Sequence, residues 1–326
     1  MYRAFIVGAA GFAAREVIRR RALDYDFHGK TALITGGSRG LGFAIARELL
    51  DVGAHVVICA RDSDRLERAR TLLAPHGDVR GVQCDVADQA EVEAMIADLG
   101  RVDVLINNAG VIAVGPFETQ RLEDFREQHD IMFWGVVHPT LAVLPQMLAR
   151  GDGRVANITS IGGKISVPYM LPYNAAKFAA VGFSEGLRAE IAHKGVLVTT
   201  VVPGLMRTGS YVAALYKGRP ATLYNLFTPI STLPVSTISG ARAARKVVAA
   251  VKRGDPELIL TLHANLAVRL NSLAPATTQR VLSQVARVLP GGGTTEAVAG
   301  KDIRSALDES LLTALGRKAR SELNQP

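Results

Sequence analysis

The sequence has only two cysteines among its 326 residues, Cys59 and Cys84. They show none of the paired spacings of a zinc site, and neither lies in a motif that would make it a nucleophile or a metal ligand. Each cysteine is the last residue of an expected β-strand. We therefore interpret both as small buried thiols, which agrees with a reducing compartment, and the sequence predicts no metal site.

An uninterrupted apolar run of the ~20 residues that span a membrane is also missing. The nearest approach is residues 4–14, which are apolar throughout and are followed by an arginine-rich segment at 15–21. Because the positive cluster follows the apolar run, this is not a standard secretory signal. Residues 1–28 are predicted to form an apolar and basic helix. This helix either associates with a membrane or packs on the domain or on a second subunit. If it associates with a membrane, its arginines favour a catalytic domain on the cytoplasmic side.

Motifs for nucleic-acid binding are absent as well, although the net charge is +8. The basic residues mostly occur singly on helical patterns, which is typical of solvated helix faces, and 19–21 is the only tight basic run. We expect no nucleic-acid partner and a cytoplasmic protein. A content of 48% hydrophobic and 21% charged residues suits a large α/β domain with a sizeable core.

From residue 30 onward, short apolar runs alternate with longer amphipathic ones. The expected strands are 31–35, 54–59, 79–84, 102–107, 154–159, 197–202 and 257–261. The expected helices between and after them are 41–52, 65–73, 90–99, 122–149, 173–193 and 240–253. Mostly apolar strands indicate burial on both faces. The pattern predicts an α/β fold with a single doubly wound parallel sheet (Rossmann) of about seven strands and helices on both faces.

The predicted division of the chain follows this pattern. Residues 29–262 are expected to form the catalytic domain, and 263–290 two C-terminal amphipathic helices at 264–273 and 277–288. A Pro-Gly-Gly-Gly break then begins at Pro290. Residues 291–326 are polar, and we expect a flexible tail with a short helix near 305–315.

The first expected strand leads into a glycine-rich turn that opens the first helix, with the sequence Thr35-Gly36-Gly37-Ser38-Arg39-Gly40-Leu41-Gly42. Glycines let the backbone approach a pyrophosphate, which then binds at the helix N-terminus. A glycine pattern alone is a weak signal, but the strand-turn-helix context is present.

The second expected strand ends without the acidic residue that usually holds the ribose hydroxyls of NAD. Arg61 stands there instead, and Arg39 in the glycine-rich turn is a second cation that could reach the same place. Two guanidinium groups suit a 2′-phosphate. We therefore favour NADP(H) over NAD(H), although Asp62 argues against this and Arg61 could simply cap the strand.

Tyr173 and Lys177 lie four residues apart on an expected helix, and Ser160 precedes the tyrosine in a separate segment. At that spacing the phenol and the ammonium share one helix face. A nearby cation favours the phenolate and makes a tyrosine, whose ordinary pKa is near ~10, a better acid or base. Ser160 could hold the oxygen that reacts.

Together these residues resemble the short-chain dehydrogenase/reductase family, in its compact branch, over about residues 30–261. The likeness comprises the glycine-rich turn, Cys84-Asp85-Val86, Asn107-Asn108-Ala109-Gly110, Ser160, Tyr173, Lys177 and Pro203-Gly204. It implies hydride transfer between nicotinamide C4 and a carbonyl or secondary alcohol. Tyr173 would be the general acid/base, Lys177 would bind the nicotinamide ribose and lower the tyrosine pKa, and Ser160 would orient the substrate oxygen.

The same resemblance implies the cofactor-binding residues. They are Gly36, Ser38, Arg39, Gly40, Leu41, Gly42, Arg61, Asp85, Val86, Asn108, Ala109, Gly110, Tyr173, Lys177, Pro203, Gly204 and Thr208. Asp85 and Val86 would contact the adenine, and Asn107 with the residues after it would form a wall beside the sheet. Pro203, Gly204 and Thr208 would lie at the nicotinamide end. The family also implies a homodimer or homotetramer through helices 122–149 and 173–193.

One position departs from the family pattern. Met132 stands where the family commonly has an asparagine, and a thioether cannot replace the hydrogen bonds of an amide. The family's asparagine is thought to hold a relay water through its main-chain carbonyl, which a methionine also has. The relay either persists or is impaired, so a cofactor-binding homologue with a regulatory or scaffold role and weak turnover remains the alternative function. A sugar-nucleotide epimerase would need a larger C-terminal substrate domain.

The substrate is expected under residues 205–238, which usually cover it in this fold. The apolar side chains there are Leu205, Met206, Tyr211, Val212, Leu215, Tyr216, Leu223, Tyr224, Leu226, Phe227 and Ile230. Such a lining suits an apolar carbonyl or alcohol. The alternative is that these residues only pack the segment on the core.

Overall fold

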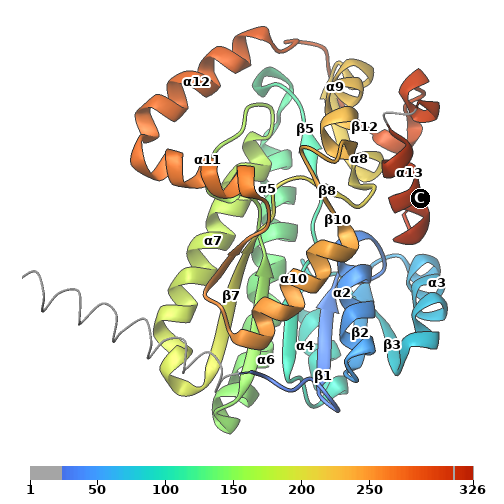
Figure 1. Ribbon diagram of the computed structural model, residues 1–326, viewed down its shortest axis with the longest axis vertical. Coiled ribbons are helices and arrows are strands. Elements are labelled where there is room, and N and C mark those ends of the chain that lie inside the picture. The colour runs from blue at the N-terminus through green and yellow to red at the C-terminus, as the bar shows by residue number, and fades with distance from the viewer. Residues whose placement is uncertain (1–23, 311–312, 326) are drawn as a thin grey trace, which may run out of the picture.

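The computed structural model describes residues 24–310 and 313–325, and its centre is a parallel sheet of seven strands (Figure 1). The strand order is β11-β7-β6-β4-β1-β2-β3. The bounds are β1 Thr31–Thr35, β2 His55–Ala60, β3 Val79–Gln83, β4 Val104–Asn107, β6 Gly153–Ile158, β7 Val196–Val202 and β11 Glu257–Ile259. The order reverses between β1 and β4, where doubly wound sheets bind ligands. The predicted fold class is confirmed.

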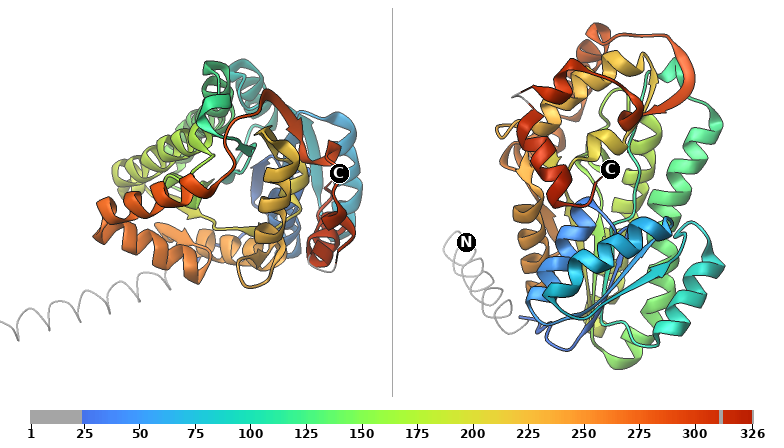
Figure 2. Two further views of the ribbon diagram at one scale, coloured as in Figure 1. Left: turned by 90° about the horizontal axis from the view of Figure 1, so that it is seen from above. Right: turned by 90° about the vertical axis from the view of Figure 1, so that its right-hand side faces the viewer.

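Helices cover both faces of this sheet (Figure 2). One layer contains α2 Gly40–Asp51, α3 Ser63–Leu73 and α10 Gly240–Arg253. The other contains α4 Gln89–Leu99, α6 Gly135–Arg150 and α7 Leu171–Ile191. The long predicted helix 122–149 is interrupted: α5 Leu122–His129 joins α6 through a π-helical turn, η3 Asp130–Trp134.

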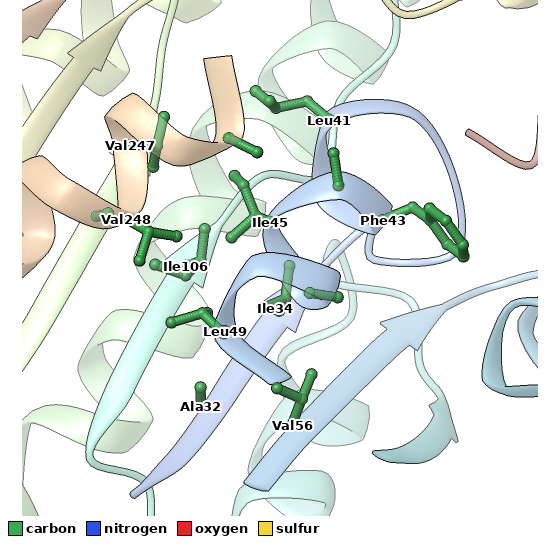
Figure 3. Packing of buried hydrophobic residues seen from close by; sticks show 14 of the residues in the cluster. Ala32, Ile34, Leu41, Phe43, Ile45, Leu49, Val56, Ile106, Val247 and Val248 are labelled. Carbon is green, nitrogen blue, oxygen red and sulfur yellow. The ribbon is translucent and has the colours of Figure 1, made fainter. Parts of the chain in front are cut away.

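Alternate side chains of β1 point into the hydrophobic cores on the two opposite faces of the sheet. Ala32 and Ile34 belong to the core beneath α2 and α10, whereas Leu33 belongs to the core on the opposite face. In Figure 3 the side chains of Ile45 and Leu49 from α2 meet Ile34 and Ile106. Burial of β1 on both faces fixes the end of the strand, and therefore the turn that follows it, in space.

Both cysteines are buried free thiols, as predicted. Within the described residues, one helical segment is long and apolar enough to cross a membrane, Leu122–Arg150, and half of its apolar window is buried inside the protein. Val143 and Met147 of this segment are completely buried in the sheet core, so it is a core helix. The predicted helix at residues 1–28 lies almost entirely outside the described residues.

Residues 205–239 form a cover beside the carboxyl ends of the strands. Its elements are β8 Met206–Arg207, α8 Ser210–Ala213, β9 Leu215–Gly218, α9 Pro220–Thr232 and β10 Ile238–Ser239. β9 lies in a small sheet with β5 Ala113–Val114 and β12 Thr294–Ala299. The predicted C-terminal helices are present as α11 Leu262–Leu273 and α12 Pro275–Val288.

The described parts of the predicted flexible tail, residues 291–310 and 313–325, contain regular structure that packs on the domain. β12 pairs antiparallel with β9, and α13 Ala314–Glu322 packs against α9. The predicted short helix near 305–315 is a single turn, η7 Ala306–Glu309, and the longer helix comes after it. Burial of Leu323, which is only 3% exposed, helps offset the entropy of ordering this segment.

Candidate active site

A cavity of about 710 Å³ lies at the carboxyl ends of the sheet strands. It brings together seventeen of the eighteen predicted site residues, from segments that are far apart in the sequence. They are Gly36, Ser38, Arg39, Gly40, Leu41, Arg61, Asp85, Val86, Asn108, Ala109, Gly110, Ser160, Tyr173, Lys177, Pro203, Gly204 and Thr208. Gly42 is the exception.

The glycine-rich turn is held by close backbone packing. A Cβ on Gly36, whose φ is 63°, would lie 2.8 Å from the Cα of Ala109. The side-chain amide of Asn108 donates hydrogen bonds to the carbonyl oxygens of Thr35 (3.1 Å) and Gly36 (3.0 Å). A Cβ on Gly42 would lie 2.3 Å from the carbonyl oxygen of Gly36, so Gly42 lets α2 pack behind the turn instead of lining the cavity.

Three arginines surround the end of the cavity beyond β2. Burial lowers the pKa of the Arg39 guanidinium, and the cations of Arg65 and Arg61 lower it further, while Asp62 acts in the opposite direction. Asp62 caps α3 by accepting the backbone N–H of Arg65, and its carboxylate lies 3.4 Å from the Arg65 guanidinium. Crowded guanidinium groups in a partly buried place favour a bound anion.

The catalytic candidates come from two elements. Ser160 follows β6, and its Oγ accepts the backbone N–H of Gly162 at 3.0 Å. Tyr173 and Lys177 lie one turn apart at the start of α7. The ammonium Nζ of Lys177 donates to the carbonyl oxygen of Ile158 at 3.0 Å and lies 6.0 Å from the centroid of the Tyr173 ring.

Burial shifts both titratable groups of this pair. It raises the pKa of Tyr173, and a hydrogen bond with Ser160 lowers the same pKa. It lowers the pKa of Lys177 to about 8. The sequence argument assigned the lowering of the tyrosine pKa to the lysine. In the structure it is the Ser160 hydroxyl that opposes the burial, and the Lys177 ammonium points to the end of β6.

Met132 lies in the π-helical turn η3 and is completely buried. It lines the cavity and shares a small apolar cluster with Ile131, Tyr173 and Ala176. A Cβ on Gly110 would lie 3.8 Å from the Met132 sulfur. The thioether therefore fills apolar space next to Tyr173, and π-helical turns are frequent at functional sites.

The remaining predicted residues divide between the cavity wall and the scaffold behind it. Asp85 and Val86 line the cavity beyond β3, and the Asp85 carboxylate lies 3.7 Å from the Arg61 guanidinium. Pro203, Gly204 and Thr208 line it beyond β7. Asn107, in contrast, joins β4 to β6 by donating to Asn157 at 2.8 Å, and does not line the cavity.

Sequence reasoning missed several lining residues, including Arg65, Tyr169, Leu289 and Gln325. Arg65 lies four residues after Arg61, and this second nearby arginine could have been identified from the sequence. Tyr169 has a φ of 67°, which is rare for a non-glycine residue, and no pattern signals it. Gln325 comes from the far end of the chain, so only tertiary structure could reveal it.

The chain is similar in sequence to known oxidoreductases. Residues 30–215 match the model of the short chain dehydrogenase family. A Mycobacterium tuberculosis protein described as the oxidoreductase SadH is 34% identical over 272 residues, which are 81% of this chain and 98% of that protein.

Two solved structures have the same fold. A short chain dehydrogenase/reductase from Burkholderia phymatum in complex with NAD is 25% identical, with a TM-score of 0.71 over 78% of this chain and 96% of that one. L-sorbose reductase from Gluconobacter frateurii, complexed with NADPH and L-sorbose, is 26% identical, with a TM-score of 0.64 over 73% of this chain and 97% of that one. The chain belongs to the short-chain dehydrogenase/reductase family of oxidoreductases.

Proposed function

We propose that this protein is an NADP(H)-dependent oxidoreductase that transfers a hydride between nicotinamide C4 and the carbon of an apolar carbonyl or secondary alcohol. The observation that carries the proposal is that one cavity holds three arginines at one end and Ser160, Tyr173 and Lys177 at the other. The glycine-rich turn lies between them, where backbone amides at the start of α2 favour a diphosphate.

The cavity walls fit such a cofactor. A Cβ on Gly36 would clash with Ala109, so the turn keeps an open backbone surface, and the crowding of Arg39 with Arg65 and Arg61 favours a phosphate beside them. When bound, the dinucleotide supplies the hydride chemistry. Arg39, Arg61 and Arg65 would hold its 2′-phosphate. That assignment supports NADP(H) over NAD(H).

The protein's own residues would handle the proton. In carbonyl reduction, the Tyr173 hydroxyl donates a proton to the substrate oxygen, and in alcohol oxidation the phenolate accepts it. The Ser160 hydroxyl hydrogen-bonds the same oxygen and fixes its position. Lys177 has its ordinary pKa lowered to about 8 by burial, which places a proton donor and acceptor near neutral pH behind the tyrosine.

The apolar residues of the cover over the cavity form two overlapping sets, because Leu223 and Phe227 belong to both. Tyr211, Tyr216 and Tyr224 are at most 1% exposed and form the core of the cover itself. Leu205, Met206, Leu223, Leu226, Phe227 and Ile230 line the cavity. Some apolar residues of the cover therefore pack it on the core, and others face the substrate cavity, as the two interpretations of residues 205–238 expected. The residues that line the cavity support an apolar substrate.

The test is a screen for NADPH oxidation over ketones and aldehydes of graded hydrophobicity. We expect kcat/KM to rise with apolar surface. Turnover restricted to small polar carbonyls would contradict the apolar substrate. Cofactor binding without turnover over the whole panel would instead favour the regulatory or scaffold role.

We also propose that the protein is a homodimer through α5, α6 and α7. Four large apolar side chains on these helices and on the π-helical turn η3 are at least 43% exposed, namely Leu122, Trp134, Leu141 and Phe178. Such residues are common at protein interfaces. A monomeric mass by light scattering at micromolar concentration would contradict the proposal.

A second surface supports association with an anionic membrane, and membrane association is one of the two alternatives expected for residues 1–28. α11 exposes Leu262, Leu266, Leu270 and Leu273, and α12 exposes Val281, Val285 and Val288. Residues 258–295 contain three arginines and no acidic residue. Apolar stripes with basic neighbours suit a negatively charged lipid surface. Flotation with phosphatidylserine vesicles should decrease for L266E/L270E, and unchanged flotation would contradict the role of this surface.

A further inference from the structure

The C-terminal strap, residues 313–325, lies against the glycine-rich turn rather than in solvent. In Figure 1 and in the right view of Figure 2 it follows α9 and ends beside the start of α2. It consists of α13 and the short segment after it, and Leu323 belongs to the core beneath α2 and α10. The last described residues of the chain therefore join the first glycine-rich turn of the domain.

Two hydrogen bonds fix this contact. The carbonyl oxygen of Leu323 accepts the backbone N–H of Gly40 at 2.8 Å, and the side-chain amide of Asn324 donates to the carbonyl oxygen of Ser38 at 2.8 Å. The first N–H group of α2 is thereby satisfied, whereas the amides of Leu41 and Gly42, the next two in the helix, have no acceptor within it. Asn324 is 4% exposed and has a φ of 52°, a conformation that asparagine tolerates.

The strap can approach this closely because three residues on its path are glycines. A Cβ on Gly209 would lie 2.5 Å from the Cγ of Arg320, and a Cβ on Gly240 would lie 2.6 Å from the Cδ1 of Leu323. A Cβ on Gly40 would lie 2.9 Å from the Nε2 of Gln325. These glycines come from the turn, from the cover and from the start of α10, so the contact surface has contributions from three separate parts of the chain.

Gln325 projects into the cavity wall at the end of the strap. Its Oε1 is buried and has no hydrogen-bond partner in the described part of the chain, and its Nε2 lies next to Gly40. The unpartnered oxygen is an acceptor, and turning the amide by 180° exchanges it for the NH₂ group, so a ligand with acceptor oxygens at this point would remove the cost of burying an unpartnered polar group. The side chain of Thr208 lies close to the same point, with its Cβ 3.8 Å from the position of a Gly40 Cβ.

We propose that the strap is part of the dinucleotide site and that the Gln325 side-chain amide binds the diphosphate of the cofactor. Gly40, Thr208 and Gln325 lie between the arginine end and the catalytic end of the cavity, where a dinucleotide carries its diphosphate. An amide can turn its NH₂ group toward phosphate oxygens. Asn324 acts as a positioning residue that holds the strap on the turn. This inference rests on the dinucleotide role proposed above.

The test measures equilibrium binding of NADPH and of NADH to the full chain, without substrate. The diphosphate is common to both cofactors, so Gln325→Ala should raise both dissociation constants by the same factor, about tenfold for a hydrogen bond to a charged group. Glu322→Gln is the matched control, because this exposed residue lies on the same strap and pairs only weakly with Lys318 at 3.8 Å. It should leave both constants unchanged.

A change below twofold for Gln325→Ala, or tighter binding, would overturn the proposal, and a loss confined to NADPH would refute the assignment to the diphosphate. Hydrogen exchange gives a second readout that needs no variant: NADPH should slow exchange of amides 314–325, and unchanged exchange would contradict a strap in the site. The proposed function itself fails separately, if the unmodified chain binds neither cofactor or prefers NADH.

Discussion

Arg65→Ala provides a direct test of cofactor choice, because this residue lies in the arginine cluster without contacting the catalytic end. The side chain of Arg65 is 28% exposed, whereas that of Arg61 is 64% exposed. Water and salt weaken the interactions of exposed charges. The less exposed guanidinium should therefore contribute more to binding a 2′-phosphate.

The expected loss of NADPH affinity for each arginine variant follows from this difference in exposure. A hydrogen bond to a charged group contributes ~1.5–3 kcal/mol, and each 1.4 kcal/mol changes a dissociation constant about tenfold. For Arg65→Ala we expect weaker NADPH binding by about 30-fold, toward the middle of that range. It also removes the cation that lies 3.4 Å from the Asp62 carboxylate, which would then repel the phosphate. For Arg61→Ala we expect NADPH binding to be weaker by about fivefold, because this side chain is more exposed.

The assay is titration of NADPH and NADH monitored by cofactor fluorescence. NADH binding should change less than twofold in Arg65→Ala, because NADH lacks the phosphate. Arg68→Ala is the control, since Arg68 is exposed on the same helix and does not line the cavity. Equal losses for both cofactors, or tighter NADH than NADPH binding in the unmodified protein, would refute the reasoning.

Three further predictions concern the catalytic end. Tyr173→Phe should abolish turnover and change the NADPH dissociation constant less than twofold, and near-normal turnover would disprove the mechanism. Because burial lowers the pKa of Lys177 from 10.5 to about 8, kcat for carbonyl reduction should fall above pH 8. The lysine of the unfolded chain keeps its proton up to about pH 10.5, so between pH 8 and 10.5 the unfolded state binds more protons than the folded state. The free energy of unfolding should therefore rise over this range by up to ~1.4 kcal/mol per pH unit, compared with the Lys177→Met variant. Equal pH dependence of the free energy of unfolding in the two proteins would contradict the lowered pKa. Met132→Asn should lower the free energy of unfolding by ~1–3 kcal/mol because it buries an amide in an apolar cluster, with kcat changed less than threefold; a tenfold gain in kcat would show that methionine impairs the relay.

The sequence by itself determined the sheet and most of the site. Strands such as Thr31–Thr35 are apolar on both faces and the helices between them are amphipathic, so local pattern and burial agree on one architecture. The glycine-rich turn, Ser160, Tyr173 and Lys177 follow particular strands or begin a helix, and a parallel sheet places the carboxyl ends of its strands at one edge. Their convergence therefore followed from their positions in the chain.

Only the tertiary structure decided the features that depend on contacts between distant segments. The polar composition of residues 291–326 predicted a mobile tail, but the strap at 313–325 packs closely against Gly40, Gly209 and Gly240. The lowered pKa of Lys177 depends on burial, and the same burial raises the pKa of Tyr173 although a lysine lies one turn away. Local sequence specifies which groups a segment carries, whereas burial and long-range packing decide what those groups contact.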